Sequence, residues 1–324
     1  MAGQVHTLLC RASCRLDLLL RQELPAVLES KQQASNSKIR RLIVAGCVRV
    51  DGRQVRIPGF TVRGGSSVSV FVDKDKFFYE KPADDIAFEL SDRDVLYEDA
   101  ALIVVNKPAF FPSEPTMVQG RDNLHAAVVR YLHKKNPSLR NPPYAGIMHR
   151  LDHETSGVIL FTKTRAVNGA VHDMFEHHTA HKVYRAVALC PPERSGPSLP
   201  SDTFCVDNFM GRISPKSSAA KWGVLPESRG GVHARTEFTV LSCGAEAGGR
   251  RTVTVEARPL TGRTHQIRVH MALSGMPLLG DVLYGGIPYE RIMLHAYSLT
   301  FPHPEDGRML TVTAPLPKEF LKFC

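Results

Sequence analysis

The sequence predicts an α+β protein in two parts. A small N-terminal α/β module precedes a larger domain built on a mixed or antiparallel sheet with flanking helices and loops. Two stretches with helical spacing and an Asp-Gly hairpin signal fall in the first 60 residues, and alternating β-type runs mixed with a few helical stretches follow a charged segment. With 324 residues, the chain is long enough for a large domain and a small one. The expected ranges are 10–75 for the module, 76–91 for a linker and 92–324 for the larger domain.

The N-terminal module is expected to contain two helices and a short hairpin. Leucines at helical spacing predict a helix over residues 15–24, which Pro25 is expected to end. A second helix is expected over residues 37–45, before Gly46. The alternating residues 48–55 enclose Asp51-Gly52, which is a strong signal for a two-residue hairpin turn. The polar face of the second helix is basic and contains Lys38, Arg40 and Arg41.

The larger domain is expected to alternate between strands and helices. Strands are expected at residues 95–97, 102–105, 158–162, 182–189, 236–241 and 251–257. Helices are expected at residues 122–134, 165–177 and 264–274, and Thr264 is a candidate N-cap for the last of them. Residues 191–231 are rich in Gly, Pro and Ser, so they are expected to form an irregular surface excursion.

The charge distribution indicates a partner that carries phosphates. The net charge is +9, and residues 1–70 alone hold eleven Lys or Arg against four Asp or Glu. Such a local basic surface attracts nucleic acid through counterion release. The alternative is a surface that only keeps the protein soluble.

The short apolar runs and the scattered cysteines of the sequence predict a cytoplasmic protein. No apolar run approaches the roughly 20 residues needed to cross a bilayer, so no membrane association is expected. The seven cysteines form no CxxC pair, which fits reduced structural thiols.

The segment 149–157, His-Arg-Leu-Asp-His-Glu-Thr-Ser-Gly, is the most informative motif. It places the carboxylate of Asp152 beside Arg150 and directly before the apolar run 158–161. A carboxylate set against a buried strand is either neutralised by a partner or kept for chemistry.

Three further segments contain candidate functional residues, each with a simpler alternative. Lys107 ends an expected strand, although a lysine in that position is commonly just solvated. Lys182 and Tyr184 share one face of an expected strand, where a tyrosine is often part of the core. The segment 261–270 carries cations and histidines at an expected helix start, which suits anion binding unless they are solvated helix residues.

Motifs of competing chemistries are missing from the sequence. It has no HExxH, no HxE followed by PCxxC, no Walker loop, no GxGxxG and no GxSxG. We therefore expect neither a metal ion nor a cofactor, and a reaction carried by carboxylate, arginine and tyrosine alone.

These motifs, taken in order, resemble the RluA-type RNA pseudouridine synthases. The resemblance covers roughly residues 92–320, through 97–108, 149–157, 182–184, 262–270, 280–285 and 294–304. Residues 15–17, 37–45 and 46–52 resemble an S4 RNA-binding domain, apart from a polar insert at 29–36.

The resemblance implies isomerisation of uridine to pseudouridine within RNA, without a cofactor. It implies that Asp152 is the catalytic aspartate, that Arg268 pairs with it, that Tyr184 stacks on the flipped base and that Arg150 holds the flipped nucleotide. Whether Asp152 acts as nucleophile or base stays open. The other expected substrate or RNA contacts are Lys107, Lys182, Arg263, His265, Arg15, Lys38, Arg40 and Arg41.

Three readings of the function compete at this point. A monomeric enzyme acting on ribosomal RNA, with the large subunit favoured, is expected, and transfer RNA is the alternative substrate. A non-catalytic S4-type RNA-binding or ribosome assembly factor would not need both Asp152 and Arg268. A nucleoside hydrolase would usually need a second carboxylate, and Glu154 is expected to point elsewhere.

Overall fold

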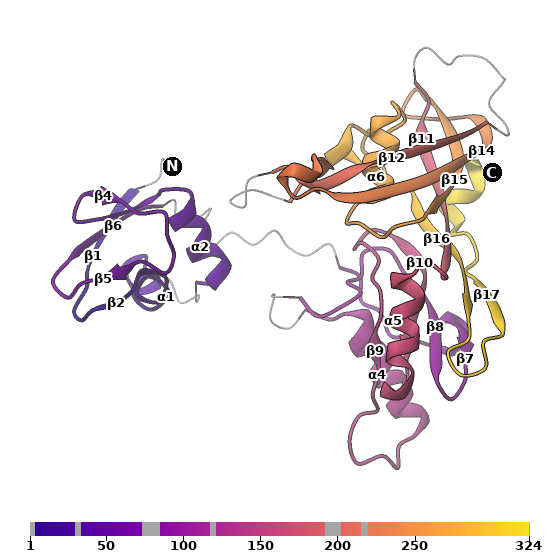
Figure 1. The fold of residues 1–324 in the computed structure, drawn as a ribbon, viewed down its shortest axis with the longest axis horizontal. Coiled ribbons are helices and arrows are strands. Elements are labelled where there is room, and N and C mark those ends of the chain that lie inside the picture. The colour runs from indigo at the N-terminus through magenta and orange to yellow at the C-terminus, as the bar shows by residue number, and fades with distance from the viewer. Residues whose placement is uncertain are drawn as a thin grey trace. The chain divides into compact units, whose positions relative to one another are not determined.

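The chain divides into two compact units in the computed structural model (Figure 1). Unit 1 comprises Met1–Ala83 with Ser214–Ala220, and unit 2 comprises Asp84–Ile213 with Lys221–Cys324. The structure describes residues 4–29, 34–72, 85–116, 121–191, 202–214 and 220–323. Most of the expected linker, and part of the polar insert at 29–36, lie outside these residues, so the expected domain boundaries stay a prediction.

Unit 1 is a small α/β module with an apolar centre. Its four-stranded antiparallel sheet has the order β1 (Gln4–Leu9), β6 (Ser67–Val72), β3 (Val48–Val50) and β4 (Arg53–Gln54). Two helices, α1 (Leu16–Val27) and α2 (Asn36–Val44), pack on it, and β2 (Cys14–Arg15) pairs with β5 (Thr61–Val62). Asp51 and Gly52 both have positive φ angles, 47° and 76°, so the predicted hairpin turn is confirmed.

The prediction that Pro25 ends the first helix is wrong. Helix α1 contains Pro25 and continues to Val27. Proline in a helix removes one backbone hydrogen bond and costs about 3 kcal/mol or more in the helix interior. Here the cost is offset by burial beyond the proline, because Leu28 is 2% exposed and its N–H donates to the carbonyl of Leu24 at 3.0 Å.

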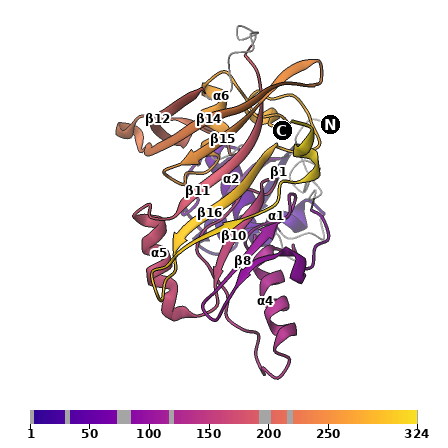
Figure 2. The ribbon, with the colours of Figure 1, turned by 90° about the vertical axis from the view of Figure 1, so that its right-hand side faces the viewer.

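Unit 2 is built on an 11-stranded mixed sheet, which confirms the predicted fold class (Figure 2). Its main path is β13 (Trp222–Val224), β12 (Thr203–Arg212), β14 (Val232–Ala247), β15 (Arg250–Pro259), β11 (His181–Leu189), β16 (Leu294–Pro302), β10 (Ser156–Thr162), β8 (Leu102–Lys107) and β7 (Val95–Glu98). Off this path, β17 (Met309–Thr313) pairs with β16 and β9 (Gly146–Ile147) pairs with β10. The β10–β16 pair is parallel and the other pairs are antiparallel.

Helices cover both faces of this sheet. Helix α4 (Leu124–Lys135) packs in the core that contains Ile159 and Phe161 of β10, whereas α5 (Asn168–Glu176) packs in the core that contains Val158 and Leu160. Helix α6 (Gln266–Leu273) packs against β14 and β15. The short 3₁₀ helices are Asp92–Asp94, Arg165–Val167, Glu227–Arg229, Val282–Tyr284 and Lys318–Phe323. No helix among the described residues is long and apolar enough to span a bilayer.

The parallel contact between β10 and β16 lies just after the motif at 149–157. Ser156 pairs with His295 and Gly157 with Ala296. Gly157 has φ of 115°, and a Cβ at this position would lie 2.1 Å from the carbonyl oxygen of Ala296. Only glycine therefore fits, and this close approach fixes where the loop that carries Asp152 leaves the sheet.

The prediction of an irregular excursion over 191–231 is wrong for its described part. That part contains β12 and β13, and β12 pairs with β14 over eight registered residues from Thr203 to Met210. The described part of β12 alternates exposed and partly buried residues, so a strand signal was present beside the Gly and Pro content. Strand β16 was not predicted because it is buried along much of both faces and lacks alternation.

Candidate active site

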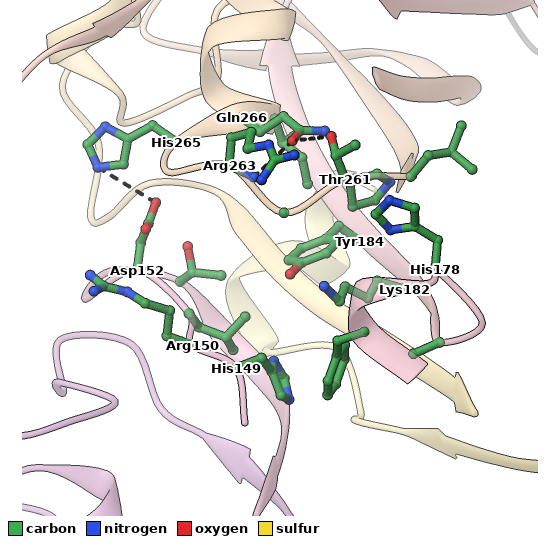
Figure 3. Close-up of a pocket in the computed structure, with 18 of the residues that line it drawn as sticks. His149, Arg150, Asp152, His178, Lys182, Tyr184, Thr261, Arg263, His265 and Gln266 are labelled. Carbon is green, nitrogen blue, oxygen red and sulfur yellow. Dashed lines mark hydrogen bonds and ion pairs between the residues drawn. The ribbon is translucent and has the colours of Figure 1, made fainter. Parts of the chain in front are cut away.

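A cavity of about 580 Å³ lies in unit 2 where the loop after β9 meets β11 and the start of α6 (Figure 3). This volume suits a small ligand or a single nucleotide base with its sugar. The residues that were predicted to act on substrate and that line it are Arg150, Asp152, Lys182, Tyr184, Arg263, His265 and Arg268. Segments separated by more than a hundred residues therefore share one pocket.

The loop that carries Asp152 is held from behind by two buried cations. The ammonium group of Lys107 donates to the carbonyls of His153 and Thr155 at 3.1 and 2.8 Å. The guanidinium of Arg291 donates to the carbonyl of Glu154 at 3.2 Å. Three consecutive carbonyls thus have charged donors, which fixes the backbone directly after the aspartate.

The expectation that Lys107 contacts RNA is wrong for this structure. Lys107 is 0% exposed, and its third donor goes to the carbonyl of Pro108 at 2.9 Å. Burial lowers the pKa of Lys107 to about 7, although the charge of Asp152 opposes this shift. Bonds to three carbonyls need the three N–H groups of the ammonium form, so the geometry corresponds to the charged side chain. Its side chain supports the Asp152 loop and does not reach the pocket.

Arg268 joins two carboxylates. Its Nε and Nη2 atoms donate to Asp281 at 2.7 and 2.9 Å, and its Nη1 atom lies 3.4 Å from Oδ2 of Asp152. Arg268 and Asp281 are 7% and 1% exposed, whereas Asp152 is 24% exposed. Although burial disfavours the charged guanidinium, the bonds to Asp281 and the nearby Asp152 raise the pKa of Arg268. The arginine is therefore fixed as a cation.

Asp152 presents one free oxygen to the cavity. Its Oδ2 atom lies beside Arg268 at 3.4 Å and beside Nε2 of His265 at 3.9 Å. Within the described residues, Oδ1 of Asp152 has no hydrogen-bond partner. A carboxylate with one oxygen beside a guanidinium and the other free can act as a nucleophile or as a base.

Tyr184 and Lys182 line the opposite side of the cavity from β11. The pairing of β11 with β16 has a bulge between Val183 and Tyr184, at the part of the strand that lines the pocket. Tyr184 packs partly against the core clusters of both halves of the sheet, and burial raises its pKa, so the phenol stays protonated. Lys182 lies 4.9 Å from the centre of the Phe175 ring, and burial lowers the pKa of this lysine to about 8.

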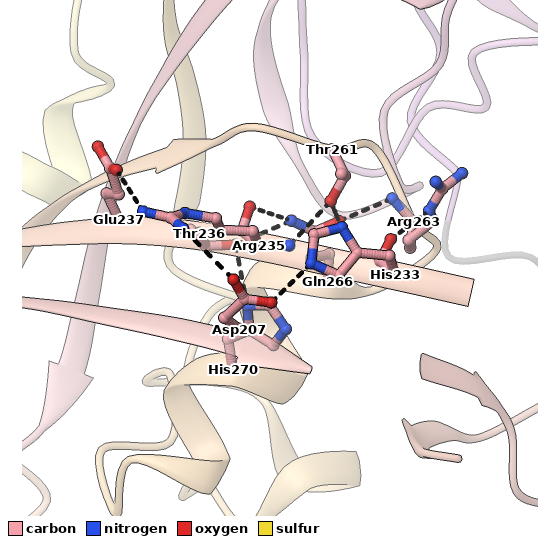
Figure 4. A network of polar contacts seen from close by, with 9 residues as sticks. All are labelled: Asp207, His233, Arg235, Thr236, Glu237, Thr261, Arg263, Gln266 and His270. Carbon is pink, nitrogen blue, oxygen red and sulfur yellow. Dashed lines mark hydrogen bonds and ion pairs between the residues drawn. The ribbon is translucent and has the colours of Figure 1, made fainter. Parts of the chain in front are cut away.

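Gln266 organises the loop before α6, which contains Arg263 and ends at His265; Figure 4 shows its contacts with Thr261 and Arg263. Its Oε1 atom accepts from the Thr261 hydroxyl and from the N–H of Arg263, at 2.7 and 3.0 Å. Its Nε2 atom donates to the carbonyl of Arg235 and the hydroxyl of Thr236 on β14. A buried side-chain amide that uses all these bonds fixes the loop rigidly on the sheet.

The prediction that Thr264 caps α6 is wrong. The residue before the helix is His265, which adopts a left-handed conformation with φ of 57° and makes no side-chain cap bond. This conformation turns the imidazole of His265 toward Asp152 and the cavity.

The remaining predicted contacts lie outside the cavity floor. Arg150 is 65% exposed at the edge of the pocket and pairs with Glu114 at 2.6 Å. Arg263 is exposed, and its Nε donates to the carbonyl of His233 at 2.9 Å. The other four belong to unit 1, so the site in unit 2 does not test them; they are Arg15, which pairs with Asp17, and Lys38, Arg40 and Arg41 on α2.

Sequence reasoning missed Asp281 and Tyr284 as parts of this site. Both belong to a segment that was noticed only through the resemblance, and neither has a local pattern that signals a site. Asp281 is the main partner of Arg268, and Tyr284 contacts His265 and Arg268. Within the ranges that the structure describes, no cluster of three or more His, Cys, Asp or Glu could hold a metal ion.

Replacing Tyr184 separates a base-stacking role from a core role. Tyr184→Phe is expected to keep near wild-type turnover, because the ring face remains. Tyr184→Ala is expected to lower single-turnover rate by roughly 10- to 100-fold, since stacking is worth about 1–3 kcal/mol per base. The reaction that the family resemblance implies, pseudouridine formation on a defined RNA, measures both. An alanine variant that is less stable but turns over normally would identify a core tyrosine.

Comparisons with known proteins agree with this geometry. The family model described as RNA pseudouridylate synthase matches residues 101–273, and the S4 domain model matches residues 14–68. Ribosomal large subunit pseudouridine synthase D of Xanthomonas campestris pv. campestris is 31% identical over 326 residues, which cover 95% of this chain and 87% of the relative. The protein of the same name from Pasteurella multocida is 30% identical over 306 residues, covering 89% and 85%.

Solved structures show the same relationship over 71% of the chain. Human RNA Pseudouridylate Synthase Domain Containing 4 superposes with a TM-score of 0.55 at 25% identity, over 71% of this chain and 91% of that one. Human RNA Pseudouridylate Synthase Domain Containing 1 gives a TM-score of 0.54 at 25% identity, over 71% and 87%. Together with the pocket built around Asp152, these matches show that the chain belongs to the RNA pseudouridylate synthase family and carries an S4 domain at its N-terminus.

Proposed function

We propose that this pseudouridine synthase converts specific uridines of large-subunit ribosomal RNA into pseudouridine, with Asp152 as the catalytic carboxylate. The observation that carries the proposal is the charged pair at the cavity, in which Arg268 holds Oδ2 of Asp152 and Oδ1 is free. The ribosomal target is supported by the names of relatives that match along most of the chain.

The proposed reaction rearranges bonds inside one nucleotide. The N1–C1′ bond breaks, the uracil turns in the pocket, C5 bonds to C1′, the proton on C5 is lost and N1 gains one. The target nucleotide leaves the helix at a cost of a few kcal/mol, and stacking on Tyr184 at the opposite wall would offset much of this. The proposed contact of Arg150 with the flipped nucleotide or its phosphate is supported by its exposure at the edge of the cavity.

The pocket brings a donor to one oxygen of Asp152 and leaves the other open. Nη1 of Arg268 lies 3.4 Å from Oδ2, whereas Lys182 lines the opposite wall, where an ammonium group suits a phosphate. Whether Oδ1 attacks the sugar or removes a proton from it is a question for trapping experiments.

Mapping pseudouridine in cells tests the target. Total RNA from cells with the gene, without it, and with the Asp152→Asn variant is compared position by position. Loss of sites in large-subunit ribosomal RNA in the last two strains is the expected result. Loss confined to transfer RNA would establish the alternative substrate. Release of free uracil from RNA by the purified protein would indicate a hydrolase instead.

Two properties of the whole protein are part of the proposal. We propose that it acts in the cytoplasm, because every cysteine in the described part of the chain is a free thiol. We also propose a monomer, because Asp152, Arg268 and Tyr184 meet in a cavity within unit 2 and need no residue of a second copy beside them. Light scattering of the purified protein at working concentrations checks the second statement.

Helix α2 of unit 1, which carries basic residues, is expected to contribute RNA affinity that does not depend on the base sequence. Arg40 and Arg41 are exposed on α2, and Lys38 is on the same helix. Changing all three to Gln is expected to weaken RNA binding and to reduce the slope of log affinity against log salt by roughly 0.7–0.9 per lost phosphate contact. Filter binding at several salt concentrations measures this slope.

The control for that experiment neutralises basic residues on the surface of unit 2. Arg140 and Arg229 are exposed residues of unit 2 that do not line the cavity, so their change to Gln is expected to alter the slope less. An unchanged slope for the triple variant of α2 would mean that this helix does not meet the RNA backbone.

A further inference from the structure

Tyr284 stands behind the two residues that flank Asp152. The centre of its ring lies 5.1 Å from the guanidinium carbon of Arg268 and 5.7 Å from the ring of His265, at an interplanar angle of 85°. Its hydroxyl lies 2.9 Å from Nδ1 of His265 and 3.0 Å from the backbone nitrogen of Trp222. One side chain thus contacts both groups that face Oδ2 of Asp152.

The hydrogen-bond directions around this hydroxyl follow from the donors present. The backbone N–H of Trp222 can only donate, so the oxygen of Tyr284 accepts that bond. The hydroxyl hydrogen then has Nδ1 of His265 as its partner. In this arrangement each donor has an acceptor, and Nδ1 accepts while Nε2 carries the ring proton.

The ring proton of His265 then points at the catalytic carboxylate. Nε2 lies 3.9 Å from Oδ2 of Asp152, the same oxygen that Arg268 approaches at 3.4 Å. Burial lowers the pKa of His265, although the charge of Asp152 opposes this, so the imidazole is neutral at physiological pH. Burial also raises the pKa of Tyr284, which keeps its hydroxyl proton in place.

The backbone at His265 shows that this orientation is imposed by its surroundings. His265 has φ of 57°, which is unfavourable for residues other than glycine and persists where neighbouring contacts determine it. The contact with Tyr284 is one of these contacts, and the bonds of Gln266 are others. The side chain therefore has a fixed direction before any RNA enters.

We propose that Tyr284 is a positioning residue for pseudouridine formation, which holds His265 as a neutral Nε2–H donor toward Oδ2 of Asp152. The proposal rests on the proposed role of Asp152. With Arg268 and His265 both directed at Oδ2, Oδ1 is the oxygen that meets the nucleotide. The backbone of β13 is linked to the site by the same hydroxyl.

Tyr284→Phe tests the hydroxyl while keeping the ring beside Arg268. The single-turnover rate of pseudouridine formation is expected to fall roughly tenfold, which corresponds to about 1.4 kcal/mol, while affinity for the same RNA stays unchanged. Tyr297→Phe is the matched control, because Tyr297 lies on β16 outside the cavity lining and packs on Arg185. A wild-type rate for Tyr284→Phe would overturn the proposal.

Two more measurements separate positioning from a structural defect. In nitrogen-15 spectra of labelled histidine, assigned with His265→Ala, wild-type His265 is expected to carry its proton on Nε2, and Tyr284→Phe is expected to lose this preference. In the double variant with His265→Ala, removing the hydroxyl is expected to add little to the loss in rate. An unchanged tautomer, or losses that multiply in full, would overturn the proposal.

The tautomer measurement does not depend on the proposed role of Asp152 being right. The tautomer of His265 is measured without substrate. If Asp152→Asn kept full activity while Tyr284→Phe changed the tautomer, the catalytic assignment would fail and the hydrogen-bond assignment would stand. If Asp152→Asn were inactive and Tyr284→Phe behaved as wild type, only the positioning role would fail.

Discussion

Asp152→Asn is expected to abolish pseudouridine formation while RNA binding survives. The amide keeps the size of the side chain but removes the charge that faces Arg268 and replaces one oxygen of the proposed reacting group with nitrogen. Loss of an essential nucleophile or base is expected to lower the single-turnover rate by more than about 10³-fold. Binding is expected to change little, because most RNA affinity comes from contacts to phosphates.

Single-turnover assays on a large-subunit RNA fragment, with filter binding on the same fragment, measure both quantities. Glu154→Gln is the matched control, since it also removes one carboxylate charge but its side chain does not line the cavity. Its Oε2 atom accepts a bond from the N–H of Ile292 at 3.4 Å, so it points away from the nucleotide, as the sequence had suggested. Near wild-type activity of Asp152→Asn would refute the catalytic assignment.

Arg268→Met is expected to destabilise unit 2 as well as to inactivate it. Without the guanidinium, Asp281 remains 1% exposed and loses two charged hydrogen bonds. Removing one partner of a buried ion pair typically costs about 3–5 kcal/mol of stability. Activity is expected to be lost in addition, because Asp152 loses its nearest cation. Urea unfolding monitors stability, and Trp222, the only tryptophan of the chain, reports on unit 2.

A second variant separates the two effects. Arg268→Met combined with Asp281→Asn is expected to recover part of the lost stability, since no uncompensated charge remains buried. It is not expected to recover activity, because Asp152 still lacks its partner. If Arg268→Met alone unfolded at the wild-type urea concentration, the pair would contribute little to stability.

The sequence predicted the residues that line the pocket better than it predicted the residues that hold them in place. The positions of Asp152, Lys182, Tyr184 and Arg268 in one pocket follow from ordered motifs, although their roles stay predictions. The support from Asp281 could not be predicted from local pattern, because the pairing of two buried residues across a turn has no periodicity. Only a folded chain shows which partner a buried charge has.

For the same reason, the sequence could not show that Lys107 supports the Asp152 loop and does not contact RNA. A cation at the end of a strand has the same sequence signature whether it faces solvent or donates to buried carbonyls. Its partners lie 46 and 48 residues away, in a loop whose path the sequence did not define. For Pro25, the local rule was outweighed by burial of Leu28, which is a tertiary effect.

The two cations behind the Asp152 loop have a consequence for the order of folding. Lys107 ends β8 and Arg291 precedes β16, so they approach the loop from strands on either side of β10. Until both strands have docked, the carbonyls of residues 153–155 lack these donors, and the hydrogen bonds that fix the conformation of the loop are missing. We therefore expect catalytic competence to require that β8 and β16 are both docked on β10.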